Sequence, residues 1–376
     1  MVACPNTPFQ NQPEDTSPPK PAKIESLMKE IAQILDLWSA VSASGQEEAV
    51  LVTVVKTQGS SYRLPGARLL LTKQGQRVGA ISGGCLEDDV VKKAWWLTEK
   101  GPIIRRYDTT ADNEISTSGY GLGCNGIIHV LMERLRPGHA EILDLIRQVR
   151  ATRSPATVAH ILKPDTHIGQ RLFDRAELAA AANPGREVFI ETLTPAVRLL
   201  IFGAGDDAIP LTQAAKFLGW EVFVYDGRAH YARREKFPQA DQVIVRPAGA
   251  PVPPIDPWTV AVLMSHSYSQ DLQALQELAN LPLPYLGVLG PNKRTEQLLS
   301  DAGLERATIA ARLHAPMGLD IGADGPEQVA LAVIAEMQAS LNGREGGTLS
   351  AYAGSIHARE ADSTGAAAWA RSIVCA

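Results

Sequence analysis

The spacing of apolar residues changes half-way along the chain and predicts two domains of different construction. Apolar residues repeat at three- and four-residue steps from Ile24 to Val41, which predicts a helix with one buried face. Short runs rich in Val, Ile and Leu follow, and they predict strands at 49–56, 67–73, 77–82, 103–108 and 126–132. Helices are expected at 86–100 and 139–152, so the first half is a mixed α/β domain.

Beyond Pro195, apolar strands alternate strictly with amphipathic helices, which is typical of a parallel, doubly wound sheet. The strands are expected at 197–202, 221–225, 258–265 and 284–289. The helices are expected after a glycine turn at 203–208 and at 268–279, 292–302 and 326–342. The fold class is therefore α/β, with an N-terminal mixed domain and a C-terminal Rossmann-like domain.

The length of 376 residues exceeds what one hydrophobic core usually serves, which agrees with two domains. The first segment is rich in proline with few large apolar groups, which predicts disorder. The expected organisation is a disordered tail at 1–23, an N-terminal domain at 24–195, a Rossmann-like domain at 196–343 and a C-terminal tail at 344–376.

Composition excludes several classes of protein. The net charge of −5, from 36 basic and 41 acidic residues, gives no general attraction for nucleic acid or anionic membranes. No apolar run approaches the roughly 20 residues of a membrane helix, and the N-terminus lacks an apolar signal core, so a cytoplasmic protein is expected. The cysteines, which are Cys4, Cys85, Cys124 and Cys375, form no CxxC pair, so neither a disulfide framework nor a zinc site is indicated.

Two cysteines lie in glycine-rich turns, where backbone amides can approach a ligand closely. Cys85 follows Gly83 and Gly84 and begins the helix expected at 86–100, where free amides stabilise a thiolate. Glu87 opposes that effect with its own negative charge, so the net change in the thiol pKa stays open. Cys124 lies in a second such turn, before the strand at 126–132. The two turns indicate a site for an anionic or soft ligand, and small buried apolar side chains are the alternative.

The C-terminal half carries a Rossmann-like turn at Gly203-Ala204-Gly205, with Asp226 at the end of the next strand, where such folds hold a ribose hydroxyl. Asp206 and Asp207 follow the glycines, and their carboxylates are expected to occupy the helix amides and repel a phosphate. The crevice beside this glycine turn is then expected to have a use other than dinucleotide binding. Arg228 favours NADP over NAD as any dinucleotide, with a solvated surface arginine as the alternative.

Further polar residues follow the ends of the expected strands, where ligands of open α/β sheets bind. His266 lies between two serines after the strand at 258–265. Lys293 and Arg294 lie in the first turn of the helix at 292–302, where cations oppose the helix dipole. A bound anion would explain them, and so would a distant acidic partner.

Several motifs, taken in order, resemble the XdhC/CoxF family of accessory proteins for xanthine dehydrogenase and carbon monoxide dehydrogenase. In the first half the matching residues are Gly59-Ser60-Ser61, Arg63, Pro65-Gly66, Ser82-Gly83-Gly84-Cys85, Glu87, Gly121 and Cys124. In the second half they are Gly203-Ala204-Gly205, Asp226-Gly227-Arg228, His266, Gly287, Leu289-Gly290, Arg294, the run from His314 to Ala323, Gly346-Gly347 and Ile356-His357. Tyr62 departs from the family pattern, where proline is usual, and so do Asp206 and Asp207, where His-Val is common.

The resemblance implies a chaperone, rather than an enzyme, that binds the molybdenum cofactor, shields its sulfurated form and passes it to a xanthine dehydrogenase-type apo-enzyme. It also implies a cysteine desulfurase as a partner, and a homodimer. The expected cofactor-binding residues are Cys85, Cys124, Ser60, Ser61, Arg63, Gly83, Gly84, Glu87, Gly203, Gly205, Asp226, Arg228, His266, Lys293 and Arg294. Among them, Cys85 and Cys124 are assigned to the molybdenum or sulfur end, and Arg63, Lys293 and Arg294 to anion contacts.

Two other functions remain open from the residues alone. An NADP-dependent oxidoreductase would use the Rossmann-like half as its catalytic core, and its cysteine turns would be structural. An interaction scaffold would dock the target enzyme and the desulfurase without holding the cofactor.

Overall fold

The computed structural model describes residues 28–43, 48–59, 61–84, 86–108, 126–163, 165–173, 186–247, 250–351 and 373–374. The elements of the first half are α1 (Met28–Ala43), β1 (Ala49–Gly59), β2 (Arg68–Thr72), β3 (Arg77–Gly79), α2 (Glu87–Leu97), β4 (Ile103–Asp108), β5 (Gly126–Leu135), α3 (Glu141–Thr152), β6 (Ala156–Lys163), η1 (Asp165–His167), β7 (Arg171–Leu172) and β8 (Glu187–Leu193). Those of the second half are β9 (Arg198–Phe202), α5 (Ala208–Phe217), β10 (Glu221–Asp226), β11 (Gln242–Val245), β12 (Thr259–Leu263), α6 (Tyr268–Leu278), β13 (Leu286–Val288), α7 (Asn292–Ala302), α8 (Arg306–Ile309), β14 (Leu313–His314), α9 (Pro326–Leu341), η2 (Leu349–Ala351) and β15 (Ile373–Val374).

The first half contains two antiparallel sheets, counted over the described strands. The five-stranded sheet has the order β3-β2-β1-β5-β4, and the four-stranded sheet has the order β15-β8-β6-β7. Helix α2 covers one face of the five-stranded sheet through Val90 and Ala94. Helices α1 and α3 and the four-stranded sheet cover the other face, where Leu131 of β5 packs on Leu162 and Phe189. The central strands β1 and β5 are therefore buried on both sides, which explains their nearly continuous apolar sequence.

A buried ion cluster, which consists of Arg68, His160 and Glu191, ties the two N-terminal sheets together. Arg68 of β2 donates a hydrogen bond from its guanidinium to Oε1 of Glu191 on β8. His160 Nε2 of β6 lies 2.8 Å from the same oxygen. All three residues are buried, with at most 6% of each exposed. Burial opposes the charge of Glu191, but Arg68 and His160 outweigh it and lower the pKa of that carboxyl to about 2.

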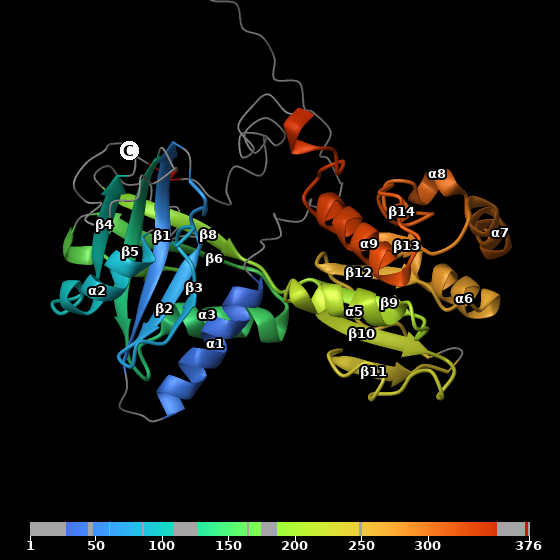
Figure 1. The fold of residues 1–376 in the computed structure, drawn as a ribbon, viewed down its shortest axis with the longest axis horizontal. Coiled ribbons are helices and arrows are strands. Elements are labelled where there is room, and N and C mark those ends of the chain that lie inside the picture. Colours follow the sequence, from blue (N-terminus) through green and yellow to red (C-terminus); the bar gives the residue numbers. More distant parts are fainter. Residues whose placement is uncertain are drawn as a thin grey trace, which may run out of the picture.

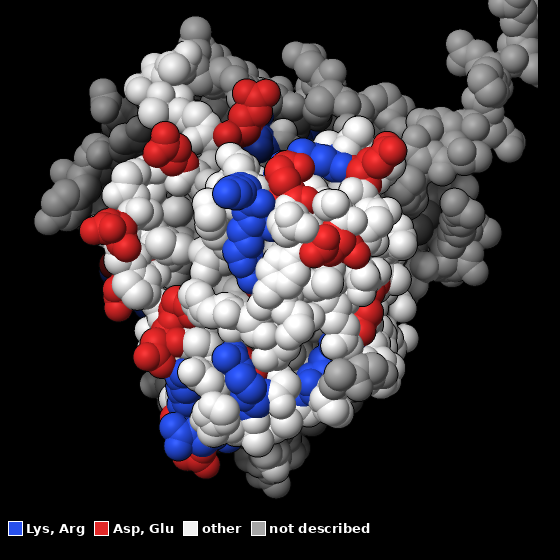
Figure 2. Space-filling model, turned by 90° about the vertical axis from the view of Figure 1, so that its right-hand side faces the viewer, with Lys and Arg blue, Asp and Glu red and all other residues white. Residues whose placement is uncertain are grey.

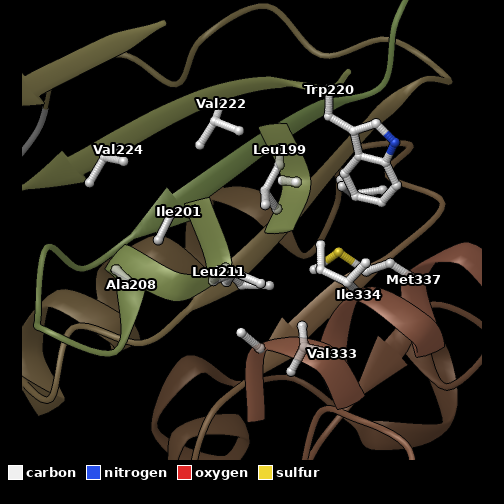
Figure 3. Close-up of a cluster of buried hydrophobic side chains, with 14 of the residues drawn as sticks. Leu199, Ile201, Ala208, Leu211, Trp220, Val222, Val224, Val333, Ile334 and Met337 are labelled. Atoms are coloured by element: carbon white, nitrogen blue, oxygen red, sulfur yellow. The ribbon is translucent and has the colours of Figure 1, made fainter. Parts of the chain in front are cut away.

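The second half is built on six parallel strands among those described, in the order β11-β10-β9-β12-β13-β14. Numbered along the chain, this is the order 3-2-1-4-5-6 of a Rossmann fold. Helices α5 and α9 pack on one face, where Leu211 and Met337 join a cluster with Trp220 (Figure 3). Helices α6 and α7 pack on the other face through Leu275 and Leu298. The prediction of an α/β chain with a Rossmann-like second half is confirmed.

The sequence pattern missed both edge strands of the parallel sheet, β11 and β14. Gln242–Val245 is a four-residue edge strand whose apolar run, Val243 to Val245, is only three residues long and too short to be recognised by periodicity. Leu313–His314 has only two residues, too few for any periodicity to show. The expected tail at 1–23 lies outside the described residues. In the segment 344–376, Ile373 and Val374 pair with Phe189 and Val188 of β8.

Figure 1 shows the two halves side by side, the first with α1 and α3 and the second with α5 and α9. Arg153, which follows α3, joins the two halves. Arg153 follows the helix in the left-handed conformation, with φ of 55°. Its guanidinium donates to both carboxylate oxygens of Asp256, to Glu221 Oε2 at 3.0 Å and to the carbonyl oxygen of Ala196 at 3.0 Å. These partners lie before or at the amino ends of strands β12, β10 and β9.

In the part of the chain that the structure describes, no helix is both long and apolar enough to cross a membrane.

Candidate functional site

The turn that precedes α2 is organised by the carboxylate of Glu87. Its Oε1 accepts hydrogen bonds from the amides of Ile81 (3.0 Å) and Ser82 (2.8 Å), and its Oε2 accepts one from the Ser82 hydroxyl. The Ser82 oxygen in turn accepts from the amides of Gly84 (3.2 Å) and Leu86 (3.1 Å). The residues on either side of Cys85 are thus fixed by one buried acid and one hydroxyl.

Glu87 stays ionised in this turn. Burial tends to raise the pKa of its carboxyl, but the hydroxyl of Ser82 and the backbone amides of Ser82 and Ile81 outweigh burial and lower it. A carboxylate here also suits the positive end of the α2 dipole. The structure gives Glu87 a positioning role in the loop.

Exchanging this acid for its neutral amide tests that role. Glu87→Gln loses the charge-assisted hydrogen bonds from two amides and a hydroxyl, and we expect about 1–2 kcal/mol less stability. The variant should also react faster at Cys85 with iodoacetamide, because the turn loosens and a negative charge beside the thiol is removed. Asp88→Asn, on the exposed side of the same helix turn, is the control. An unchanged alkylation rate in Glu87→Gln would contradict the positioning role.

Residues 61–63, which follow the predicted cofactor-binding residue Ser60, lie beside this turn. A Cβ built on Gly83 would lie 3.8 Å from the ring of Tyr62, so the chain at 61–63 contacts the chain at 83–84. Arg63 of that segment makes a bidentate pair with Glu30 of α1, so its charge is already matched within the chain. Ser61 donates to the Arg63 carbonyl and holds the same loop.

Three of the predicted residues, Ser60, Cys85 and Cys124, lie outside the described residues. Gly59, which precedes Ser60, pairs with Gly126, which follows Cys124 by two residues. The end of β1, which leads into Ser60, and the start of β5, which follows the segment of Cys124, are therefore neighbours. Among the described residues, no group of three or more His, Cys, Asp and Glu side chains is placed to hold a metal.

A crevice of about 320 Å³ opens at the carboxyl ends of β9, β10 and β12, and three of the remaining predicted residues, Gly203, Asp226 and Arg228, line it. Gly203 has φ of 129°, and a Cβ at this position would lie 2.4 Å from the backbone of Met264. Asp226 lines the crevice, and its carboxylate accepts hydrogen bonds from the Ala204 amide and from Arg228 through its amide, Nε and Nη2. Arg228 also donates to the Ser265 carbonyl at 2.9 Å.

These contacts occupy the groups that a dinucleotide would need. Burial tends to raise the pKa of Asp226, but Arg228 and the Ala204 amide outweigh it, so the carboxyl stays ionised and internally bonded. A ribose hydroxyl would have to displace Arg228 to reach it. The Rossmann strand order is therefore present here with its ribose-binding acid already satisfied, which disfavours the NADP-dependent oxidoreductase.

The aspartates after the glycine turn behave differently from the expectation. Neither carboxylate caps α5: Asp206 pairs with Lys236 at 2.8 Å, and Asp207 Oδ2 lies 2.7 Å from Nε2 of His266. Tertiary partners thus compete with the helix amides for these carboxylates. His266 follows β12 with φ of 55°, and its side chain is 63% exposed. Arg246 and Gln270 line the crevice, and the sequence pattern missed them because neither lies in a glycine turn.

The two basic residues in the first turn of α7, Lys293 and Arg294, differ in their surroundings. Arg294 donates to Oδ2 of the buried Asp271 at 2.6 Å, so the acidic-partner alternative explains it. Asp271 Oδ1 accepts from the Ser265 hydroxyl at 2.6 Å, which links α6, α7 and the end of β12. Lys293 is exposed. Figure 2 shows acidic and basic side chains interspersed over the face of the second half that is turned to the viewer.

Both halves of the chain resemble known proteins. A family model described as "XdhC Rossmann domain" matches residues 199–337, and one described as "XdhC and CoxI family" matches residues 42–108. The chain is 34% identical to a protein of Bacillus subtilis (strain 168) described as a probable xanthine dehydrogenase component, over 78% of this chain and 93% of that protein. It is 26% identical to the molybdenum cofactor insertion chaperone PaoD of Escherichia coli (strain K12), over 77% of this chain and 82% of the chaperone.

A solved structure agrees with these matches. The crystal structure of a xanthine dehydrogenase from Bacillus halodurans superposes with a TM-score of 0.72 at 28% identity, and the match covers 83% of this chain and 96% of that one. The similarity therefore includes both halves. Family profiles, relatives and fold agree, and the chain belongs to the XdhC and CoxI family.

Proposed function

We propose that this protein binds the molybdenum cofactor as cargo and inserts it into a molybdoenzyme of the xanthine dehydrogenase type. The observation that carries the proposal is the similarity to a molybdenum cofactor insertion chaperone over 77% of this chain, which spans both halves. The ordered turn next to Cys85 supports it, because a fixed thiol-bearing loop is suited to a soft metal or sulfur ligand.

The roles within the site follow from chemistry. Cys85 and Cys124 contact the molybdenum or its terminal sulfur, and Glu87 holds the loop that presents Cys85. The chaperone shields the sulfurated form of the cofactor from oxidation, because thiols at the metal occupy the positions that an oxidant would otherwise reach. A cysteine desulfurase supplies the sulfur, and the protein acts in the cytoplasm as a homodimer.

Cofactor binding and transfer test the proposal together. Cofactor released from a purified molybdoenzyme is titrated anaerobically into the wild-type protein, into Cys85→Ala/Cys124→Ala and into the matched control Cys4→Ala/Cys375→Ala. We expect saturable binding that is at least about tenfold weaker in the first variant and unchanged in the control, since a metal–thiolate contact is lost only in the former.

Transfer is then measured as the activity regained by an apo-enzyme of the xanthine dehydrogenase type. Absence of cofactor binding by folded wild-type protein would refute the proposal. Equal binding by both cysteine variants would leave the chaperone function standing and remove the cysteines from the site. Analytical ultracentrifugation with and without a cysteine desulfurase tests the homodimer and the partner.

A further inference from the structure

A second groove lies in the first half, and none of its lining residues lines the Rossmann crevice. Its volume is about 810 Å³, within the range of sites for small ligands. It lies where the end of α2 and strands β1, β4 and β5 meet β6 and β8. None of the residues predicted from the sequence lines it.

The floor of the groove carries a row of basic side chains across three neighbouring strands. Lys56 of β1 pairs in register with His129 of β5, and His129 pairs with Arg106 of β4. Directly paired residues of antiparallel strands point to the same face, so the three side chains lie side by side. They lie three residues from Gly126, where β5 begins, or about 10 Å along the strand.

Two β-bulges direct lysines into this groove. In β1 the register shifts between Val54 and Lys56, so Val55 and Lys56 both face the four-stranded sheet instead of alternating. In β6 the register shifts between Ile161 and Lys163, with the same effect on Leu162 and Lys163. A bulge disrupts the strand ladder and re-aims one side chain, and such features concentrate beside functional sites. Two bulges on facing strands, each followed by a lysine, indicate that the groove is built for charge.

The charges that line the groove are predominantly positive. The lining cations are Lys56, Lys100, Arg106 and Lys163, and the lining carboxylates are Glu99 and Glu187. Glu187 bridges Lys56 at 2.9 Å and Lys163 at 3.0 Å, and Asp108 pairs with Arg106. Burial and the charges of Lys56, Arg106 and Lys163 lower the pKa of His129 against the opposing effect of Glu187, which agrees with a positive potential.

The other wall is apolar and includes an exposed aromatic ring. Trp96 of α2 is 71% exposed at the groove, and Ile104, Leu162 and Ile168 complete this side. An exposed indole next to an apolar wall suits the face of a flat heterocycle. The groove therefore combines a surface for a ring with a row of donors for an anion.

We infer that this groove binds the phosphate-bearing pterin end of the cargo, with the phosphate on the row of Lys56, His129 and Arg106. The inference rests on the proposed function, because it takes the molybdenum cofactor as the ligand. It adds a location: the anion is held by β1, β4 and β5, and the start of β5, which follows Cys124 by two residues, lies about 10 Å away.

The test compares Lys56→Gln/Arg106→Gln with the wild type in the anaerobic cofactor titration. Arg105→Gln is the control, because it also removes a positive charge from β4. Arg105 is exposed and does not line the groove. We expect affinity at least about tenfold weaker in the groove variant, unchanged affinity in the control, and recovery in Lys56→Arg/Arg106→Lys. Equal affinity in all proteins would overturn the inference and leave the proposed function intact. Normal binding with loss of transfer would also overturn it and make the groove a docking surface for the apo-enzyme.

A second measurement needs no cofactor. The pKa of His129 is followed by NMR of the imidazole ring, with and without inorganic phosphate as the probe. A bound phosphate offsets the cations that lower this pKa, so we expect it to rise in the wild type and in Arg105→Gln and to stay unchanged in Lys56→Gln/Arg106→Gln. If the wild-type protein bound no cofactor, the proposed function would fail. The groove would then be judged by this titration alone, and an unchanged His129 pKa in the wild type would overturn the phosphate site.

Discussion

Gly203→Ala is expected to destabilise the second half of the protein by about 3–5 kcal/mol. The methyl group would lie 2.4 Å from the backbone carbonyl of Met264 and 2.5 Å from the Cα atom of Ser265, and backbone cannot turn aside as a side chain can. Alanine would also have to adopt φ of 129°, which is strained for any residue with a Cβ. Both costs fall at the centre of the parallel sheet, between β9 and β12.

Urea denaturation followed by far-UV circular dichroism measures this loss. Gly303→Ala is a matched control, because Gly303 also has a positive φ, of 68°, but nothing lies within 4 Å of its built Cβ. The control should lose only about 1 kcal/mol, from backbone strain. Equal losses in the two variants would show that the close approach of β9 to β12 has no energetic cost.

Glu191→Gln is expected to lower the free energy of unfolding by about 3 kcal/mol at neutral pH. The amide keeps the shape of the side chain but leaves the buried guanidinium of Arg68 without a counter-charge, and an unpaired buried charge is strongly destabilising. Glu296→Gln is the control, since its pair with Arg306 is largely exposed and contributes at most about 1 kcal/mol.

The pH dependence of this effect has a defined sign. The pKa of Glu191 falls from 4.5 to about 2 on folding, so its ionised form stabilises the native state above pH 4.5. That contribution, about 3 kcal/mol, is lost as the pH falls through this interval to about 2. The stability difference between wild type and Glu191→Gln should therefore shrink progressively below pH 4.5. A difference that stays constant from pH 6 to pH 3 would contradict the buried ion cluster.

The long elements of the fold follow from local sequence. The strand at Arg198–Phe202 and the helix at Pro326–Leu341 are apolar or periodic over their full length, so periodicity places them within a residue or two. The edge strands at Gln242–Val245 and Leu313–His314 are stabilised by pairing with distant strands, and no local pattern reports that pairing. Tertiary contact decides them, as it decides most short strands.

The candidate site is likewise visible in the sequence only in part. Glycine turns and strand-end acids such as Gly203 and Asp226 are visible in the sequence, because their backbone requirements are local. The partner of each charge is not visible: Arg228 turns back to Asp226, and Arg294 reaches Asp271 across 23 residues. The groove was missed for the same reason, since its lysines reach one face only through bulges, and a bulge appears only when two strands are paired.

The joint at Arg153 separates the two cavities. It holds Glu221 and Asp256 at the amino edge of the parallel sheet, and the crevice beside Asp226 opens at the carboxyl edge. The strands between these two edges are about five residues long, so the edges lie about 16 Å apart. The crevice therefore opens at the edge of the parallel sheet that is turned away from Arg153, and Arg153 fixes the amino edge to the first half without closing the crevice.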